Sequence, residues 1–254
     1  MKTDIASIYR SAWAFAFACP LLFLIPVLVE LAQHVVEWQG GMYDGIAGAK
    51  AAEADPLRLQ FGFAKTLALL LPGYWFTRYI LFERDSARAA RIEWPAVGLW
   101  LILFALHGWQ QWWTLFGPSL TGLMGLTGTA GQWTGYALLL LEGVAGIYFT
   151  AWTVAWALGN ASIGPVRSAR IMAGHFWRTV LLSLAGVLPL MIAHYALSFG
   201  AIFAPAFLDW PLLLIDALVV GLLALTMAGS GAVAARHAAK ARSTSLLPER
   251  AGHA

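Results

Sequence analysis

Charged residues are scarce in this chain of 254 residues. Asp, Glu, Lys and Arg make up 11% of the sequence and hydrophobic residues make up 60%, whereas soluble domains carry about 25% charged residues. A soluble fold of this length has too little interior to bury that much apolar surface. The scarcity of charge therefore excludes a soluble globular domain and indicates that lipid is the solvent for much of the chain.

Cysteine and the short motifs of soluble enzymes are also nearly absent. The single cysteine, Cys19, excludes an internal disulfide and a metal site built from several cysteines. The sequence holds no phosphate-binding loop, dinucleotide-binding fingerprint or paired-histidine metalloprotease motif, and no nucleophile elbow. The hydrophilic loops are short, so we predict neither a soluble catalytic domain nor a catalytic residue.

Long apolar runs are what the sequence has instead. Six stretches reach the roughly 20 residues that a helix needs to cross a bilayer. They lack the alternation of barrel strands, and helices are the other way to satisfy backbone polar groups in lipid. We therefore predict an all-α, polytopic membrane helical bundle over residues 1–234. The six predicted transmembrane helices cover residues 12–36, 61–82, 95–116, 133–158, 176–200 and 211–234.

The basic residues predict the orientation of the chain in the membrane. Thirteen of the sixteen Lys and Arg residues lie at the N-terminus, in or beside the second and fourth loops, or in the C-terminal tail. The positive-inside rule then places both termini on the cytoplasmic side of a bacterial-type inner membrane. Anionic lipid headgroups are the expected partners there, and nucleic acid is not, because the charge is split among short segments. Residues 235–254 are predicted to form a basic, disordered cytoplasmic tail.

A short motif precedes each odd-numbered span. A Ser-Ala pair beside basic residues begins at Ser11, at Ser86 and at Ser168. The pairs are 75 and 82 residues apart, about one helical hairpin, and regular spacing of similar units is typical of a repeat. The pattern predicts three repeated hairpins, each led by a basic segment in the headgroup layer. Chance recurrence in an Ala-rich sequence is the alternative.

Two of these segments carry a resemblance to known proteins. The stretch SARIMAGHFWRTVLL, residues 168–182, resembles a lead-in of uncharacterised bacterial six-span inner-membrane proteins. Some of those proteins are similar to the membrane domains attached to glycerophosphodiester phosphodiesterases. The stretch IASIYRSAWAFAF, residues 5–17, resembles the same lead-in. The resemblance implies a six-span architecture, and since neither stretch carries a functional residue, it implies no phosphodiesterase activity.

Polar and ionisable residues recur inside the predicted spans. A charged side chain at the bilayer centre costs about 2.5–3.5 kcal/mol on insertion scales, so such groups face the bundle interior and find partners. Projected onto the membrane normal, these groups all lie at or outside the midplane. They predict one ligand-binding polar pocket in the outer half of the bundle, and a protonated Glu142 is a further way to lower the cost. The residues are Glu30, His34, His107, Gln110, Glu142, His194 and Asp216.

This pattern leaves three functional readings open. The leading one is a non-enzymatic membrane protein that binds or transports a small solute or lipid through an outward-facing polar pocket. The second is a structural or assembly subunit, working with a protein partner or a second copy, whose buried polar residues only hold helices together. The third is an intramembrane metal-dependent enzyme.

The metal-dependent reading rests on the end of the first span. Glu30, His34 and Glu37 share one helical face at positions i, i+4 and i+7, and carboxylate with imidazole suits zinc, iron or manganese. Further ligands would have to come from His107, His194 or Asp216. Haem is another alternative, since three histidines lie at comparable depth, but no haem-attachment motif is present. The leading reading includes no cofactor.

Overall fold

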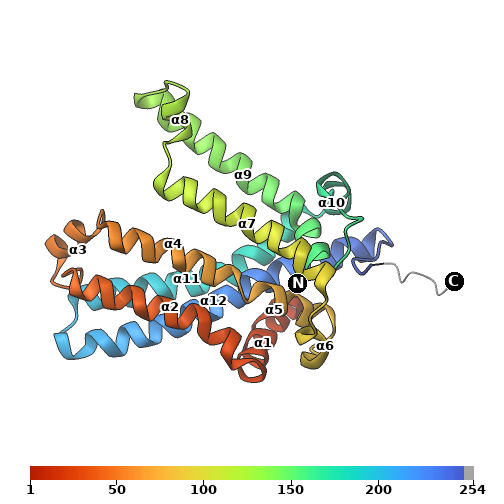
Figure 1. Ribbon diagram of the computed structural model, residues 1–254, viewed down its shortest axis with the longest axis horizontal. Helices are drawn as coiled ribbons and strands as arrows, with labels where there is room; N and C mark the ends of the chain where they lie inside the picture. The colour runs from red at the N-terminus through yellow and green to blue at the C-terminus, as the bar shows by residue number, and fades with distance from the viewer. Residues whose placement is uncertain (249–254) are drawn as a thin grey trace. The chain divides into compact units, whose positions relative to one another are not determined.

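The structure is a computed structural model that describes residues 1–248 (Figure 1), and all its regular elements are α-helices. This confirms the all-α class. Four of the helices, α2, α9, α11 and α12, are long and apolar enough to cross a membrane, which defines a multi-pass membrane protein. The helices are α1 (Lys2–Ala18), α2 (Pro20–Gln39), α3 (Ile46–Ala52), α4 (Pro56–Leu70), α5 (Gly73–Leu81), α6 (Ser86–Ala90), α7 (Trp94–Phe116), α8 (Leu120–Leu123), α9 (Gly128–Ala157), α10 (Pro165–Met172), α11 (Phe176–Phe203) and α12 (Ala206–Ala241).

The first predicted span, residues 12–36, is two helices. α1 ends at Ala18 and α2 begins at Pro20, with Cys19 between them in a non-helical conformation. Proline lacks a backbone N–H and fits the first position of a helix better than its interior. The apolar run continues across the break, which is why hydrophobicity alone predicts a single element.

The second predicted span, residues 61–82, is also interrupted. α4 ends at Leu70, and α5 begins at Gly73 after Pro72. Pro72 cannot donate the backbone hydrogen bond that would continue α4. The third predicted span agrees in its bounds with α7, but the C-terminal half of α7 holds Trp, Gln and His, which lower its mean hydropathy, and α7 is not among the four spanning candidates.

The chain divides into two compact units. The first comprises Met1–Arg91 and Leu181–Val233, and the second comprises Ile92–Val180 and Ala234–Ala254, of which the structure describes the part up to residue 248. In the first unit α2 packs along α4, and α11 runs antiparallel to α12. In the second unit α7 packs on α9, and α10 packs on the C-terminal half of α9. The helices α11 and α12 continue through both units.

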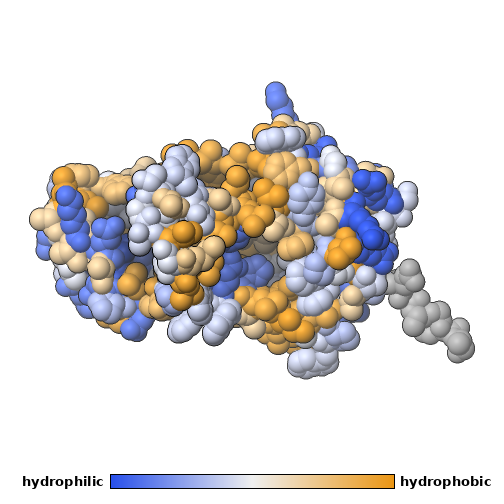
Figure 2. Space-filling view, turned by 90° about the horizontal axis from the view of Figure 1, so that it is seen from above, coloured by the Kyte–Doolittle hydropathy of each residue, from blue (hydrophilic) through white to orange (hydrophobic). Residues whose placement is uncertain are grey.

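Apolar side chains cover much of the outer surface of the helices (Figure 2). Only 11% of the most apolar part of α9, and of α11, is buried. Leu139, Leu140 and Leu141 on α9 are each about two-thirds exposed. Exposed leucines in unbroken rows are unfavourable in water, but they match the acyl chains of a bilayer.

A shorter helix precedes each of three long ones. α1, α6 and α10 come directly before α2, α7 and α11, and they carry Ser11, Ser86 and Ser168 of the Ser-Ala pairs. Ser168 is fully buried. Its hydroxyl donates to the Tyr148 carbonyl and accepts from the Trp152 N–H, and these two bonds connect α10 to α9.

The segment predicted as a disordered tail begins as helix. α12 continues through residue 235 to Ala241, and Leu246 beyond it is buried. The side-chain amide of Asn160 donates to the carbonyls of Leu246 and Leu247, at 3.3 and 3.0 Å. Alanine has the highest helix propensity, and the run of alanines from Ala232 extends the helix past the predicted boundary. The remainder of the predicted tail, residues 249–254, lies outside the described residues.

Close packing of α12 on α2 depends on one glycine. A Cβ added at Gly221 would lie 2.5 Å from Cγ2 of Val27 and 2.8 Å from the ring of Phe23. We expect Gly221→Leu to lower the free energy of unfolding by about 1–3 kcal/mol, the usual cost of overpacking. Unfolding with SDS in mixed micelles measures this loss. Gly143→Ala on α9 is the control, since a Cβ there meets no atom within 4 Å. An equal loss of unfolding free energy in both variants would contradict a special role of Gly221 in packing α12 on α2.

Candidate functional site

Opposite charges on α2 and α4 match in spacing. Glu30 and Glu37 are seven residues apart on α2, and Arg58 and Lys65 are seven residues apart on α4. The order is reversed: Lys65 Nζ lies 2.8 Å from Glu30 Oε1 and Oε2, and Arg58 Nε donates to Glu37 Oε1 at 2.9 Å. Seven residues are close to two helical turns, so both pairs form on the facing sides of two antiparallel helices.

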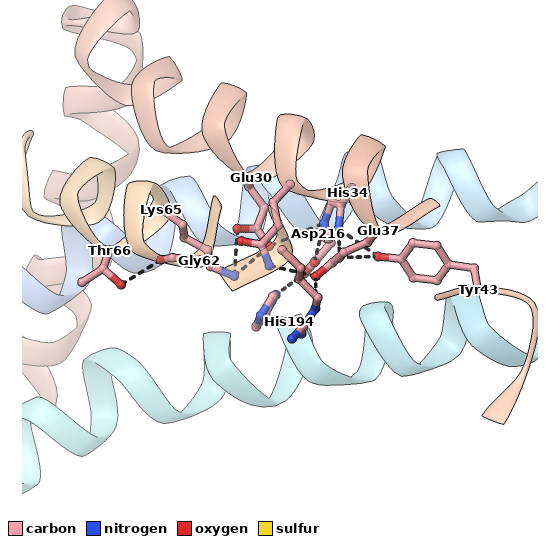
Figure 3. A network of polar contacts seen from close by, with 11 residues as sticks. Glu30, His34, Glu37, Tyr43, Gly62, Lys65, Thr66, His194 and Asp216 are labelled. Atoms are coloured by element: carbon pink, nitrogen blue, oxygen red, sulfur yellow. Dashed lines mark hydrogen bonds and ion pairs between the residues drawn. The ribbon is translucent and has the colours of Figure 1, made fainter. Parts of the chain in front are cut away.

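His34 is the centre of a buried network (Figure 3). Its Nε2 lies 3.0 Å from Asp216 Oδ2 on α12, and its Nδ1 lies 3.1 Å from Glu37 Oε2, one helical turn along α2. Only 1% of the His34 side chain is exposed. Because both ring nitrogens face carboxylate oxygens, the ring satisfies both contacts as an imidazolium, which carries an N–H on each nitrogen.

Asp216 accepts from two histidines on two different helices. Its Oδ2 is paired with His34, and its Oδ1 lies 2.7 Å from Nδ1 of His194 on α11. Asp216 is fully buried, while His194 is 12% exposed. The carboxylate therefore joins α2, α11 and α12, because it also accepts from Nδ1 of His194.

Glu37 has every acceptor position filled. Its Oε1 accepts from Arg58 and from the side-chain amide of Gln33, at 2.8 Å for Gln33, and its Oε2 accepts from His34 and from the Tyr43 hydroxyl, at 2.8 Å for Tyr43. Tyr43 lies in the loop after α2. Burial and the neighbouring Glu37 charge raise the pKa of the Tyr43 phenol above its ordinary value, so it remains a donor.

The network is electrically balanced. Three buried carboxylates, on Glu30, Glu37 and Asp216, meet three cations, on Lys65, Arg58 and the His34 imidazolium. An ion pair removed from water is tolerated only when its charges are compensated and its remaining hydrogen-bonding positions are filled. Charge balance, together with the hydrogen bonds of Glu37 and Asp216, explains how three carboxylates lie inside an apolar bundle.

The structure brings together four of the seven residues predicted for the polar pocket: Glu30, His34, His194 and Asp216, which all belong to the first unit. His107, Gln110 and Glu142 belong to the second unit. His107 Nδ1 donates to the Leu103 carbonyl of its own helix at 2.8 Å, and the Gln110 amide donates to the Glu142 carboxylate across α7 and α9. The partner of Glu142 within its unit is thus an amide.

Sequence reasoning missed Arg58, Lys65, Gln33 and Tyr43. Arg58 lies just before the second predicted span, residues 61–82, and Lys65 lies near its start, and neither was included in the predicted pocket. Both belong to α4 and pair with carboxylates of α2. The seven-residue spacing of both charge pairs was the available signal. No pattern in the sequence distinguishes Gln33 or Tyr43 from other polar residues near a span end.

A cavity of about 320 Å³ adjoins Arg58. It lies where α3 and the start of α4 meet the end of α11, and its wall is mostly apolar. Its three charged lining residues are Lys50, Glu53 and Arg58. The apolar lining residues are Met42, Ile46, Ala49, Phe199, Ile202 and Phe203.

The ligand atoms that gather for a metal differ in part from those predicted. Glu30, His194 and Asp216 each offer one atom, and the three atoms lie within 4.8 Å of one another. The predicted face was Glu30, His34 and Glu37, with further ligands from His107, His194 or Asp216, so the gathered atoms include Glu30 and two of those further candidates. In the structure Nδ1 of His34 contacts Oε2 of Glu37, and Nε2 of His34 contacts Asp216.

Comparisons with known proteins add no assignment: no family model, no curated protein and no solved structure matches the chain. Its class, a multi-pass helical membrane protein, rests on the four apolar helices.

Neutralising a buried carboxylate should destabilise the protein more than neutralising an exposed one. We expect Asp216→Asn to lower the free energy of unfolding by about 3–5 kcal/mol, because it leaves an uncompensated cation inside the bundle. Glu142→Gln is the matched control: Glu142 is exposed and bonded to an amide, so its loss leaves no buried charge. SDS unfolding of both variants measures the difference. Equal losses of unfolding free energy would show that the buried network stabilises the protein no more than the exposed Gln110–Glu142 bond does.

Proposed function

We propose that this membrane protein binds a small amphiphile with an anionic headgroup in the cavity between α3, α4 and α11. The observation that carries the proposal is the combination of an apolar wall with two cations, Lys50 and Arg58, at one cavity. The volume of about 320 Å³ is at the lower end of the range for small-ligand sites. An apolar chain fits the wall, and an anionic head fits the cations.

The headgroup preference follows from the donors of Arg58. A guanidinium has five N–H donors. Nε donates to Glu37, and Nη1 lies 3.4 Å from the Glu53 carbonyl. Donors therefore remain for a carboxylate or phosphate, which a guanidinium binds in a bidentate manner. Arg58 is 26% exposed, and the balanced network behind it fixes its position.

The proposal places the cavity on the outer side of the membrane. In the proposed topology α2, the α4–α5 pair, α7, α9, α11 and α12 cross the bacterial inner membrane as three hairpins, with both termini in the cytoplasm. Support comes from the distribution of basic residues and from the short helices α1, α6 and α10 that precede α2, α7 and α11. The cavity is built by α3, in the first loop, which this topology turns outward.

The pairing of charges in the network favours a second candidate, a structural or assembly subunit. All three carboxylates have cationic partners, and the pairs join four helices of the first unit. A network with these contacts holds helices together without any ligand. The two candidates differ in what they require of the cavity, since only the first needs it to accept an amphiphile.

A photoreactive fatty acid tests the binding proposal in nanodiscs. We expect cross-links to concentrate on the cavity wall, within residues 42–58 and 199–203. Ala49→Phe fills part of the cavity, so we expect it to reduce this labelling about tenfold, a change of about 1.4 kcal/mol in affinity. An alcohol of the same chain length should label the wall less than the carboxylate does, because it lacks the anionic head.

Ala47→Phe is the matched control, because Ala47 is on the same helix but exposed and does not line the cavity. It should leave the labelling unchanged. Labelling spread evenly over the lipid-facing helices, and insensitive to Ala49→Phe, would reject the binding proposal and leave the structural candidate.

A further inference from the structure

Three helices of the first unit each direct one ligand atom to a common point. Glu30 comes from α2, His194 from α11 and Asp216 from α12, and the three ligand atoms lie within 4.8 Å of one another. Glu30 and Asp216 are fully buried. In Figure 3 these side chains approach one another beside Lys65. Metal sites inside helical bundles are built in the same way, from carboxylates and histidines on facing helices.

A cation already occupies one side of this cluster. The Lys65 ammonium lies 2.8 Å from both oxygens of Glu30, so the position accommodates positive charge. Lys65 is 20% exposed, and lysine is a compact charge on a flexible four-carbon stem. The side chain can therefore withdraw along α4 towards solvent without unfolding a helix, which leaves Glu30 free to bind another cation.

We propose that Glu30, His194 and Asp216 form a binding site for a divalent transition-metal ion, Zn²⁺ or Mn²⁺, which displaces the Lys65 ammonium. One imidazole nitrogen and two carboxylate oxygens suit these ions, and water completes the coordination. Ca²⁺ and Mg²⁺ prefer oxygen ligands alone, so the imidazole selects against them. The proposal does not depend on what occupies the cavity beside Arg58.

The remaining contacts of the network support the ligands. His34 bonds the second oxygen of Asp216 at 3.0 Å, and such outer contacts orient metal-binding carboxylates. Ligand atoms around a tetrahedral zinc ion are about 3.3 Å apart, given bonds of about 2.0–2.2 Å. The three atoms all lie within 4.8 Å of one another, so side-chain movement alone can bring them to this spacing, and His194, the most exposed of them, has the most room to move.

Metal binding to tag-free, metal-stripped protein tests the site. We expect about one Zn²⁺ per chain after gel filtration, measured by mass spectrometry of the metal, and no retained Ca²⁺. Co²⁺ serves as a spectroscopic probe, because its visible absorption reports a nitrogen- and oxygen-bound ion. Absence of stoichiometric Zn²⁺, Mn²⁺ and Co²⁺ would overturn the proposal.

Two variants shift the affinity in opposite directions. Lys65→Gln removes the competing ammonium, and we expect Zn²⁺ to bind about tenfold more tightly. His194→Ala removes a ligand, and we expect binding to weaken about 100-fold, as for the loss of groups that hold a metal site. His107→Ala is the control, because His107 is bonded to its own helix in the second unit. The Zn²⁺ affinity of this variant should equal that of the parent protein.

The Lys65→Gln variant keeps the test decisive if His194→Ala does not fold. A Lys65→Gln protein with unchanged or weaker Zn²⁺ affinity would contradict displacement of the ammonium. Equal losses of Zn²⁺ affinity in His194→Ala and His107→Ala would show adventitious binding to histidines and would likewise reject the site.

Discussion

The contact of His34 with two carboxylates is the interaction on which the first unit depends. One imidazolium compensates Asp216 on α12 and Glu37 on its own helix, and it is almost completely buried. In a medium of low dielectric constant, charges attract strongly, but each charge left alone is costly. The ring therefore allows Asp216 to lie inside the bundle, and Asp216 in turn holds His194. The packing of α2 against α11 and α12 follows from this contact.

The same charges set the register of α2 against α4. A shift of either helix by one turn would separate Glu30 from Lys65 and Glu37 from Arg58 together, because both pairs have the same spacing. Apolar side chains alone specify register weakly between helices in lipid, since lipid chains are as apolar as leucine. A balanced network thus serves structure, and it also orients Arg58 at the cavity and brings Glu30 beside His194. Architecture and candidate function share one set of residues.

Some parts of this site follow from the sequence and others do not. Glu30, His34, His194 and Asp216 are identifiable because ionisable residues in apolar spans need partners. Arg58 and Lys65 were not included, because they lie at the start of the second predicted span and in its flank, where a long cationic side chain can reach the headgroup layer without a buried partner. Glu142 has the same local signature as Glu30, yet it meets an amide on α7. A lone carboxylate in an apolar run looks the same in the sequence whether its partner is a cation or an amide. The breaks at Cys19 and Pro72 were missed because hydropathy does not respond to backbone geometry.

The sequence by itself determined the helical class, the lipid environment and the approximate bounds of the long helices. These depend on composition and on length, which are properties of consecutive residues. Only the tertiary structure decided which charges meet, because pairing depends on the rotation of each helix about its axis and on its offset along its neighbour. Asp216 and His194 lie on successive helices, and His34 lies 182 residues from Asp216. No pattern of neighbouring residues predicts a contact over that separation in sequence, and only the fold brings the three side chains together.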